Sequence, residues 1–294
     1  MRFPRTSIIV LLCTCLAVVS LHAQENLDLK GTSCIPVRHV DEESLAFRHG
    51  EKMDFVLHYR WGAINTDVAT ATVSLDSLTY DGHEAFLCSA YGKTSKMFDL
   101  FFKVREDFKS WFTRDGLKPL KFTRDTYEGG YEARNTYHYD WNAVEPCISA
   151  EVYSSKRGLR SMTLPLTPCT FDLPALFFFA RNMNFDVIEP GRKYPMTFAI
   201  DDDVYNVYFI LYGPETKKIK GLGTVKTIKF AAKLLEGEVF KGEEDMLIWV
   251  TDDDNRLPVY FEAPLLVGVA SGRLTGYEGL KHPFDALVEP AKKK

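Results

Sequence analysis

Residues 69–76 read Ala-Thr-Ala-Thr-Val-Ser-Leu-Asp. Apolar side chains alternate with small polar ones along this stretch, which is the period of a β-strand with one buried face. The preceding stretch has the same period, because Met53, Phe55, Leu57 and Tyr59 alternate with residues that include Lys52, Asp54 and His58. The sequence therefore predicts a fold that begins with half-buried strands.

Two dipeptides indicate hairpin turns between strands. Asp81-Gly82 separates the strand at 69–76 from an apolar run at 85–91, and Gly129-Gly130 separates residues 120–128 from 131–140. Such pairs favour the tight turns that join antiparallel strands. Further strands are expected at residues 148–155, 160–166, 194–200, 204–212, 224–230, 246–251, 257–262 and 266–274. The fold class is thus mostly β, a large curved antiparallel sheet or half-open barrel.

Two stretches depart from the strand period and predict short helices. Residues 94–102 space Met97, Phe98, Phe101 and Phe102 for one or two helical turns. Residues 172–182 begin with Asp172 at an N-cap position and Pro174 in the first turn, and a run of three phenylalanines follows. The second helix is expected to be mostly buried.

The N-terminus has the three regions of a signal peptide. Two arginines precede an apolar run, and Leu21-His22-Ala23 stands before the polar Gln24. Cys13 and Cys15 lie too early in this segment to accept a lipid, and the apolar run is too short to span a bilayer. We expect a signal peptide at 1–23, an N-terminal extension at 24–46, one antiparallel β domain at 47–280 and a C-terminal tail at 281–294. The mature chain is expected to be periplasmic or secreted, with no membrane span.

Charge and motifs argue against several classes of function. The formal net charge is −4, and loss of two arginines with the signal peptide makes it more negative, so nucleic acid is not an expected partner. The histidines are scattered singly, and no Gly-x-Ser-x-Gly elbow occurs. The acidic runs at 201–203 and 252–254 lack the spacing of a calcium loop and are interpreted as solvated turns. We therefore expect no catalytic residues, no metal, no cofactor and no enzyme activity.

Several segments, taken in order, are similar to those of a known family. They are Phe47-Arg48-His49-Gly50-Glu51, Tyr59-Arg60-Trp61-Gly62, Tyr137-His138-Tyr139-Asp140, Asp172-Leu173-Pro174-Ala175-Leu176 and the block from Ile248 to Val259 with its Trp249-Val250-Thr251-Asp252 and Arg256-Leu257-Pro258. With this order and spacing the chain resembles the bacterial domain-of-unknown-function 3108 family from about Phe47 to Leu274. It departs from the family pattern at Asn65-Thr66-Asp67 and at Pro174-Ala175.

The resemblance implies export and a curved antiparallel sheet, and it implies no activity. The layout is similar to the half-open barrels of periplasmic lipoprotein carriers. That likeness concerns the fold, which does not determine function.

Two covalent modifications are expected. The strands at 148–155 and 160–166 flank Lys156-Arg157-Gly158, and a hairpin centred on residue 158 would place Cys147 opposite Cys169 at disulfide distance. Cys34 with Cys88 is the second candidate pair, since an exported protein meets an oxidising compartment. Asp76-Ser77-Leu78 resembles the short acceptor motif of periplasmic O-glycosylation, which makes Ser77 a candidate acceptor.

Three functional interpretations stay open at this stage. In the first, the concave sheet binds an apolar small molecule, lipid or acyl chain. Its lining residues are Phe55, Leu57, Tyr59, Phe177, Phe178 and Trp249. In the second, the protein is an envelope scaffold that engages another envelope protein. An enzyme ranks last, because no nucleophile–base pair or metal cluster is evident.

The signal-peptide prediction has a direct test. Because cleavage after Ala23 leaves Gln24 as the first residue, N-terminal sequencing of protein recovered from the periplasm should begin with Gln-Glu-Asn. Recovery of Met1, or of a lipid-modified cysteine at the first position, would contradict it.

Overall fold

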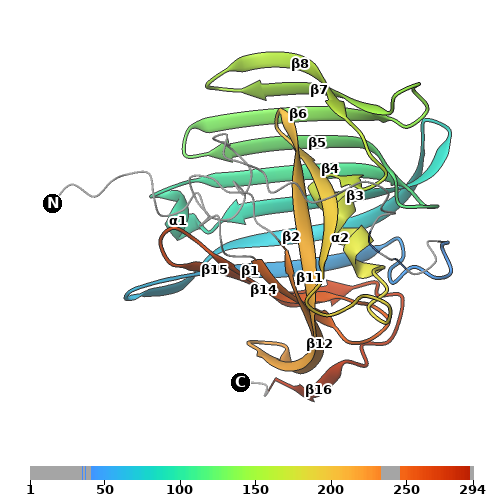
Figure 1. The fold of residues 1–294 in the computed structure, drawn as a ribbon. Coiled ribbons are helices and arrows are strands. Elements are labelled where there is room, and N and C mark those ends of the chain that lie inside the picture. Colours follow the sequence, from blue (N-terminus) through green and yellow to red (C-terminus); the bar gives the residue numbers. More distant parts are fainter. Residues whose placement is uncertain (1–34, 36, 38–40, 233–245, 292–294) are drawn as a thin grey trace.

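The computed structural model describes residues 35, 37, 41–232 and 246–291. The predicted signal peptide lies outside the described residues. One 16-stranded, mostly antiparallel sheet forms the protein, and its strands follow the order β8-β7-β6-β5-β4-β3-β2-β1-β15-β14-β13-β12-β11-β10-β9, with β16 paired to β12. The sheet curls strongly around a concave face without closing into a barrel (Figure 1). The predicted fold class is therefore confirmed.

The strands of the first half are β1 (Glu51–Trp61), β2 (Ile64–Tyr80), β3 (His83–Thr94), β4 (Val104–Thr113), β5 (Pro119–Glu128), β6 (Tyr131–Asp140), β7 (Cys147–Ser154) and β8 (Gly158–Pro165). Those of the second half are β9 (Thr170–Phe171), β10 (Lys193–Ile200), β11 (Asp203–Ile219), β12 (Gly223–Ala232), β13 (Met246–Thr251), β14 (Pro258–Pro264), β15 (Val269–Glu278) and β16 (Leu287–Pro290). The two helices are α1 (Lys96–Asp99) and α2 (Leu173–Arg181).

The predicted hairpin turns are both present. Asp81 and Gly82 have φ values of 49° and 76° and join β2 to β3 directly after the Tyr80–His83 pair. Gly129 and Gly130 also have positive φ and join β5 to β6. Positive φ at both central residues matches the twist of the flanking strands, which explains the choice of these residues.

Strand β4 was not among the predicted strands. Its alternate residues Val104, Glu106, Phe108, Ser110 and Phe112 all lie on the buried face. Because Glu106 and Ser110 occupy two of these positions, the apolar alternation that reveals a strand is interrupted. These two polar residues on the buried face also make β4 part of the candidate functional site.

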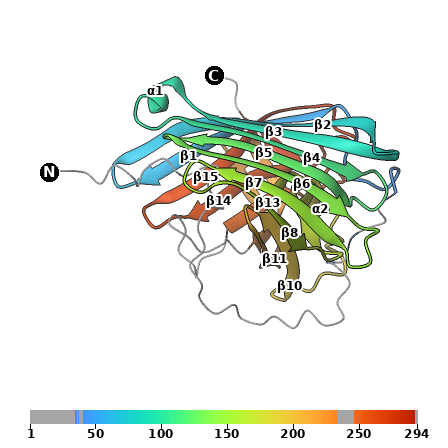
Figure 2. The same cartoon turned by 90° about the horizontal axis from the view of Figure 1, so that it is seen from above.

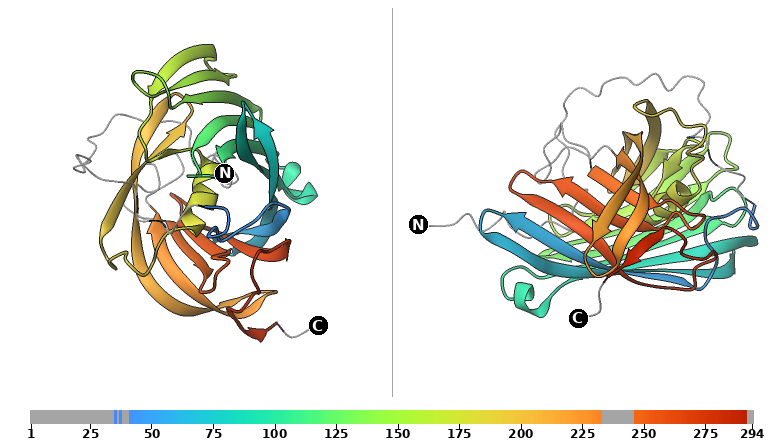
Figure 3. Two further views of the ribbon diagram at one scale, coloured as in Figure 1. Left: turned by 90° about the vertical axis from the view of Figure 1, so that its right-hand side faces the viewer. Right: turned by 90° about the horizontal axis from the view of Figure 1, so that it is seen from below.

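The two ends of the sheet approach each other across its open side. Strand β8 contacts β11, and the Arg160 Nη1 atom lies 2.7 Å from the Oδ2 atom of Asp202 in the β10–β11 turn. Arg157 makes a second ion pair with the same carboxylate at 3.1 Å. The molecule consequently has the outline of an incomplete barrel when viewed along its axis (Figure 3).

Helix α2 lies on the concave face of the sheet, between its two arms (Figures 2 and 3). The Asp172 Oδ1 atom accepts a hydrogen bond from the Ala175 amide at 3.0 Å, and Pro174 stands in the first turn. The predicted cap and helix are thus confirmed. Phe178 is fully buried, and its ring contacts Phe47 edge-on at 4.7 Å and Phe112 at 6.0 Å between centroids. The helix therefore fills one end of the concave face with aromatic core.

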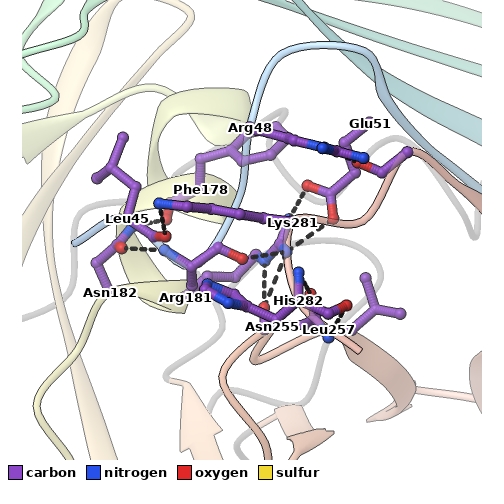
Figure 4. Close-up of polar contacts among 12 residues, drawn as sticks. Leu45, Arg48, Glu51, Phe178, Arg181, Asn182, Asn255, Leu257, Lys281 and His282 are labelled. Carbon is purple, nitrogen blue, oxygen red and sulfur yellow. Dashed lines mark hydrogen bonds and ion pairs between the residues drawn. The ribbon is translucent and has the colours of Figure 1, made fainter. Parts of the chain in front are cut away.

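A buried ion pair fixes the end of α2 to the sheet (Figure 4). The Arg181 Nη1 and Nη2 atoms donate to the two carboxylate oxygens of Glu51 at 2.6 and 2.9 Å, and both side chains are fully buried. The remaining donors of Arg181 reach the backbone oxygens of Asn255 and Ala46. Each guanidinium nitrogen therefore has a partner, as a stable buried charge requires.

The same region anchors segments on both sides of the predicted domain boundaries. The Asn182 Oδ1 atom accepts from the Ala46 amide, and the Lys281 Nζ atom donates to the Leu45 carbonyl. Asn255 bonds to the backbone of His282 in both directions. Residues after 280 also form β16, so part of the predicted tail belongs to the sheet.

The predicted Cys147–Cys169 disulfide is wrong. Cys147 is free, and it lies opposite Pro165 in the β7–β8 hairpin. The hairpin is centred two residues earlier than assumed, so Cys169 falls beyond the paired region. Cys169 is disulfide-bonded, but not to Cys147 or Cys88, which are both free. The Cys34–Cys88 pair is excluded for the same reason, and Cys34 lies outside the described residues.

The Arg181–Glu51 pair generates a stability prediction. The substitution Arg181→Met should lower the free energy of unfolding by about 3–5 kcal/mol, because it leaves the Glu51 carboxylate buried without its partner. Adding Glu51→Leu should recover a large part of that loss, since an apolar pair carries no desolvation cost. Urea unfolding of the two single variants and the double variant measures the coupling. A double variant as unstable as the sum of the single variants would contradict this prediction.

Candidate functional site

A second group of buried polar residues lies on the concave face of β4, β5 and β6. We call it the carboxyl cluster: Glu106, Arg124, Thr126, Glu128, Asn135 and Asp201. The first five are at most 5% exposed. Asp201 comes from the β10–β11 turn and has a φ of 50°, a left-handed value that Asp adopts more readily than most residues.

Hydrogen bonds connect most of the cluster. The Arg124 Nη1 atom donates to Asp201 Oδ1 at 2.8 Å, and Arg124 Nε donates to Thr126 Oγ1 at 2.7 Å. Thr126 in turn donates to Glu106 Oε2 at 2.6 Å. The Asp201 carboxylate also accepts from Asn135 Nδ2 at 3.0 Å. Arg124 is thus bonded directly to the Asp201 carboxylate and, through the Thr126 hydroxyl, to Glu106.

The two glutamates have strongly raised pKa values. Burial raises the pKa of Glu106 to about 9, although Arg124 opposes the shift, and burial raises the pKa of Glu128 to about 7. Glu106 is paired with Thr126 across the strands and Glu128 with Val104, so the two carboxyls are diagonal neighbours on one face. At neutral pH Glu106 therefore holds a proton, which it can donate to Glu128.

Four buried atoms of this cluster have no hydrogen-bond partner within the described part of the chain. They are Glu106 Oε1, Arg124 Nη2, Glu128 Oε1 and Asn135 Oδ1. The two glutamate side chains are hydrogen-bond neighbours when one of them is protonated. Arg124 Nη2 is an unpaired donor, and Asn135 Oδ1 is an unpaired acceptor, within the described residues. Each unpaired buried group costs about 1–3 kcal/mol, so a molecule that pairs with both would gain affinity.

A third polar group separates the carboxyl cluster from α2. Asp172 Oδ2 accepts from Ser110 at 3.0 Å and from Tyr139 at 3.1 Å, while Oδ1 caps the helix. Burial raises the pKa of Asp172 to about 7, and burial also raises the pKa of the neighbouring Cys88 thiol. Both carboxylate oxygens of Asp172 have hydrogen-bond partners. In this respect Asp172 is like the fully paired Arg181 and unlike the carboxyl cluster, which has unpaired atoms.

The structure brings together some of the residues predicted to line a ligand site. Phe55, Leu57 and Tyr59 lie side by side on the buried face of β1. The cross-strand row of Phe55 continues through Ala71 and Gly92 to Glu106, so this row runs from the apolar face to the carboxyl cluster. Phe178 belongs to the helix core, and Phe177 packs edge-on against it at 5.3 Å.

Trp249 lies in a different cross-strand row from Leu57. It is aligned across the strands with Lys229, Tyr260 and Arg273, whereas Leu57 is aligned with Gly272, Phe261 and Ile248. Adjacent rows project from opposite faces of a regular sheet, but the register is irregular after Trp249, and this side chain is 4% exposed and belongs to the same buried apolar cluster as Phe55 and Phe178. Its indole N–H donates to Glu215, and Lys217 Nζ lies 3.5 Å from the centroid of its ring. Ser77 is exposed near the end of β2, and its modification stays a prediction.

Sequence reasoning did not identify the carboxyl cluster. One signal was available: Arg124, Thr126 and Glu128 alternate within β5, which places three polar side chains on one face. Whether that face points into the core or toward solvent depends on the packing of strands that are distant in the sequence. The interpretation of residues 201–203 as solvated turns is wrong for Asp201, whose carboxylate lies against the buried Arg124.

The described residues contain neither a metal-binding cluster nor a membrane-spanning helix. No group of three or more His, Cys, Asp or Glu side chains in the ranges 41–232 and 246–291 is arranged to hold a metal ion. None of the helices in those ranges is long and apolar enough to cross a membrane.

Comparison with known proteins agrees with the sequence patterns. The model of the family described as "Protein of unknown function (DUF3108)" matches residues 54–275. No curated protein matches the chain. A β-barrel-like protein of the DUF1849 family from Brucella abortus has a similar fold, with a TM-score of 0.51 and 10% identity over 80% of this chain and 100% of that one.

Two further structures are more distant. A candidate exported protein with a YmcC-like fold from Bacteroides fragilis has a TM-score of 0.35 and 7% identity over 83% of this chain and all of that one. A candidate lipoprotein from Parabacteroides distasonis has a TM-score of 0.31 and 11% identity over 84% of this chain and all of that one.

The carboxyl cluster generates a prediction for the pH dependence of stability. Glu128 keeps its proton in the folded state up to about pH 7 and loses it near pH 4.5 when unfolded. The folded state therefore binds more protons between these values, so the free energy of unfolding should fall as the pH rises through this window. A tenfold difference in proton affinity is worth about 1.4 kcal/mol, and Glu106 extends the fall toward pH 9.

The substitution Glu128→Gln should flatten this dependence, and Glu132→Gln, at an exposed position of β6, is the matched control. Urea unfolding across the pH range measures both. The prediction fails if stability rises with pH from 5 to 7 or if both variants keep the same slope as the parent protein.

Proposed function

We propose that this chain, which belongs to the DUF3108 family of proteins of unknown function, is an exported, non-catalytic binding protein for an amphipathic lipid-like molecule. The apolar chain of the ligand would lie against the concave face near Phe55 and Leu57. Its polar end would meet the carboxyl cluster. The periplasm is the compartment that the signal peptide favours.

The observation that carries this proposal is a pair of buried atoms, Arg124 Nη2 and Asn135 Oδ1, that have no hydrogen-bond partner within the described residues. Buried polar groups in proteins almost always find partners, so a donor and an acceptor left free on paired residues call for one. These two residues are directly paired between β5 and β6. A single small head group can therefore span them.

The cluster favours a neutral head group. The charge of Arg124 is already offset by Asp201 at 2.8 Å, and the raised pKa of Glu106 keeps that carboxyl uncharged at neutral pH. A hydroxyl offers both a lone pair for the guanidinium and a proton for the amide oxygen. A monoacylglycerol meets these requirements, whereas a fatty acid anion would be repelled once Glu128 ionises.

Small side chains connect the polar and apolar parts of this face. Ala71 and Gly92 stand between Phe55 and Glu106 in the cross-strand row. Contact with about 200–300 Å² of acyl-chain surface would contribute about 5–8 kcal/mol before the cost of association. The resulting affinity is micromolar at best, which suits a protein that also releases its ligand.

The carboxyl pair supports a second candidate function, a hydrolase that uses Glu106 as acid and Glu128 as base. Two carboxyls whose pKa values are pushed apart are the usual basis of such catalysis. Glu106 and Glu128 are 1% and 5% exposed, and Arg124 and Asn135 are each 2% exposed, so either function requires the concave face to open for its ligand. An envelope scaffold is the further alternative. It requires no ligand on the concave face.

The binding proposal predicts different effects for two neighbouring substitutions on β2. Ala71→Phe places a ring on the concave face and should abolish binding of a fluorescent monoacylglycerol. Thr70→Phe places the same ring on the opposite, exposed face and should leave binding unchanged. Fluorescence titration of delipidated protein measures both, with melting temperature as the check on folding.

Absence of saturable binding to the parent protein would remove the carrier function and leave the scaffold. Equal binding by both variants would show that the ligand sits elsewhere. Turnover of the ligand that is lost in Glu128→Gln would favour the hydrolase.

A further inference from the structure

Three neighbouring turns at one end of the sheet expose large apolar side chains. They are the β1–β2 turn at 61–64, the segment with α1 at 95–103 and the β14–β15 turn at 265–268. We call them the apolar rim. Its exposed apolar residues are Trp61, Ile64, Met97, Leu100, Phe101 and Leu266, and Leu100 and Phe101 are 83% and 77% exposed.

The sheet order explains why these turns lie together. Strands β3, β2, β1, β15 and β14 are consecutive neighbours. The pairs Ala69–Thr94, Trp61–Ile64 and Arg60–Val269 place the three connections at the same edge. In the views of Figures 1 and 2 they project from the same side of the molecule, and the β1–β2 turn reaches farther out than α1.

The exposure of the α1 segment is fixed by its own contacts. Asp99 forms an ion pair with Arg105 at 2.5 Å and accepts a hydrogen bond from Thr94. Phe98 packs against the cluster around Leu57 and Tyr59, and the Phe102 ring lies close to Gly129. Phe98 and Phe102 thus turn toward the protein. Met97, Leu100 and Phe101 are held outward between these anchors.

The charged residues on this edge are mostly basic. Arg60, Lys93, Lys96 and Lys103 are all exposed. The acidic Asp99 is offset by Arg105, which keeps the pKa of that carboxyl at about 2. The chain as a whole carries a formal net charge of −4, so the basic character is local to the rim.

From this combination we infer that the apolar rim binds the surface of a bilayer containing anionic phospholipids. The apolar side chains enter the interfacial region, and the four basic residues pair with lipid phosphates. Insertion of apolar groups flanked by basic ones is how peripheral proteins bind such surfaces. A lipid surface also accommodates six side chains on three separate turns, without the matching shape that a protein partner requires. The inference does not depend on ligand binding to the concave face.

Vesicle flotation tests the inference with the purified mature protein. The protein should float with vesicles of phosphatidylcholine and phosphatidylglycerol, and binding should weaken with phosphatidylcholine alone or at high salt. The double variant Leu100→Ser/Phe101→Ser should reduce partitioning at least about tenfold, since it removes two inserted side chains. The matched control is Val144→Ser/Val288→Ser, which changes exposed apolar residues outside the rim.

A second pair of variants tests the charge. Lys96→Glu/Lys103→Glu should abolish the preference for phosphatidylglycerol, whereas Lys218→Glu/Lys220→Glu, at exposed positions near the β11–β12 turn, should not. Quenching by brominated phospholipid locates the contact, because Trp61 is the one tryptophan on the rim. Trp61→Phe should remove most of the quenching.

The inference is overturned if the parent protein floats with neither vesicle, or if rim and control variants partition equally. It is also overturned if the rim substitutions convert a dimer to a monomer in light scattering without changing flotation. In that case the rim is an interface between two copies of the chain.

Discussion

The buried guanidinium of Arg181 joins the parts of the molecule that the sheet alone does not connect. Its bidentate contact with Glu51 holds α2 against β1, and its other donors hold the backbone at residues 46 and 255. A buried charge is stable only when all its donors are paired, so these contacts fix the position of the helix. The helix in turn fills one end of the concave face. Its position therefore determines how much of that face a ligand could contact.

The carboxyl cluster has the opposite character, although it uses the same kinds of side chain. Within the described residues Arg124 has one unpaired donor, and the carboxyl groups of Asp201, Glu106 and Glu128 lie around it. In a network that serves only to stabilise the fold, such an unpaired donor would lower the stability of the folded state. In a binding site it is the source of both affinity and selectivity, because a ligand that supplies the missing partners is favoured over one that does not. This difference between two buried arginines is why the proposed function rests on one of them and the stability of the fold on the other.

The sequence predicted the elements with regular patterns well and the contacts between distant segments poorly. Local signals sufficed for the Asp81-Gly82 turn and for α2 with its Asp172 cap, because their geometry is set by adjacent residues. The residue opposite Cys147 depends on strand register, and a shift of two residues in the hairpin centre removes the expected contact with Cys169. The carboxyl cluster joins Asp201 to Asn135 and Arg124, which lie 66 and 77 residues earlier in the chain, and no local pattern reveals those contacts.

Native mass spectrometry of the protein purified gently from the cell envelope tests the central claim most directly. If the concave face binds a lipid-like molecule, part of the protein should carry one extra mass per chain, and collisional activation should release a neutral amphipathic lipid. The bound fraction should fall in an Ala71→Phe variant and should not fall in Thr70→Phe. Protein that carries no bound molecule under conditions that retain weak ligands, and that binds none when offered monoacylglycerol, would contradict the account.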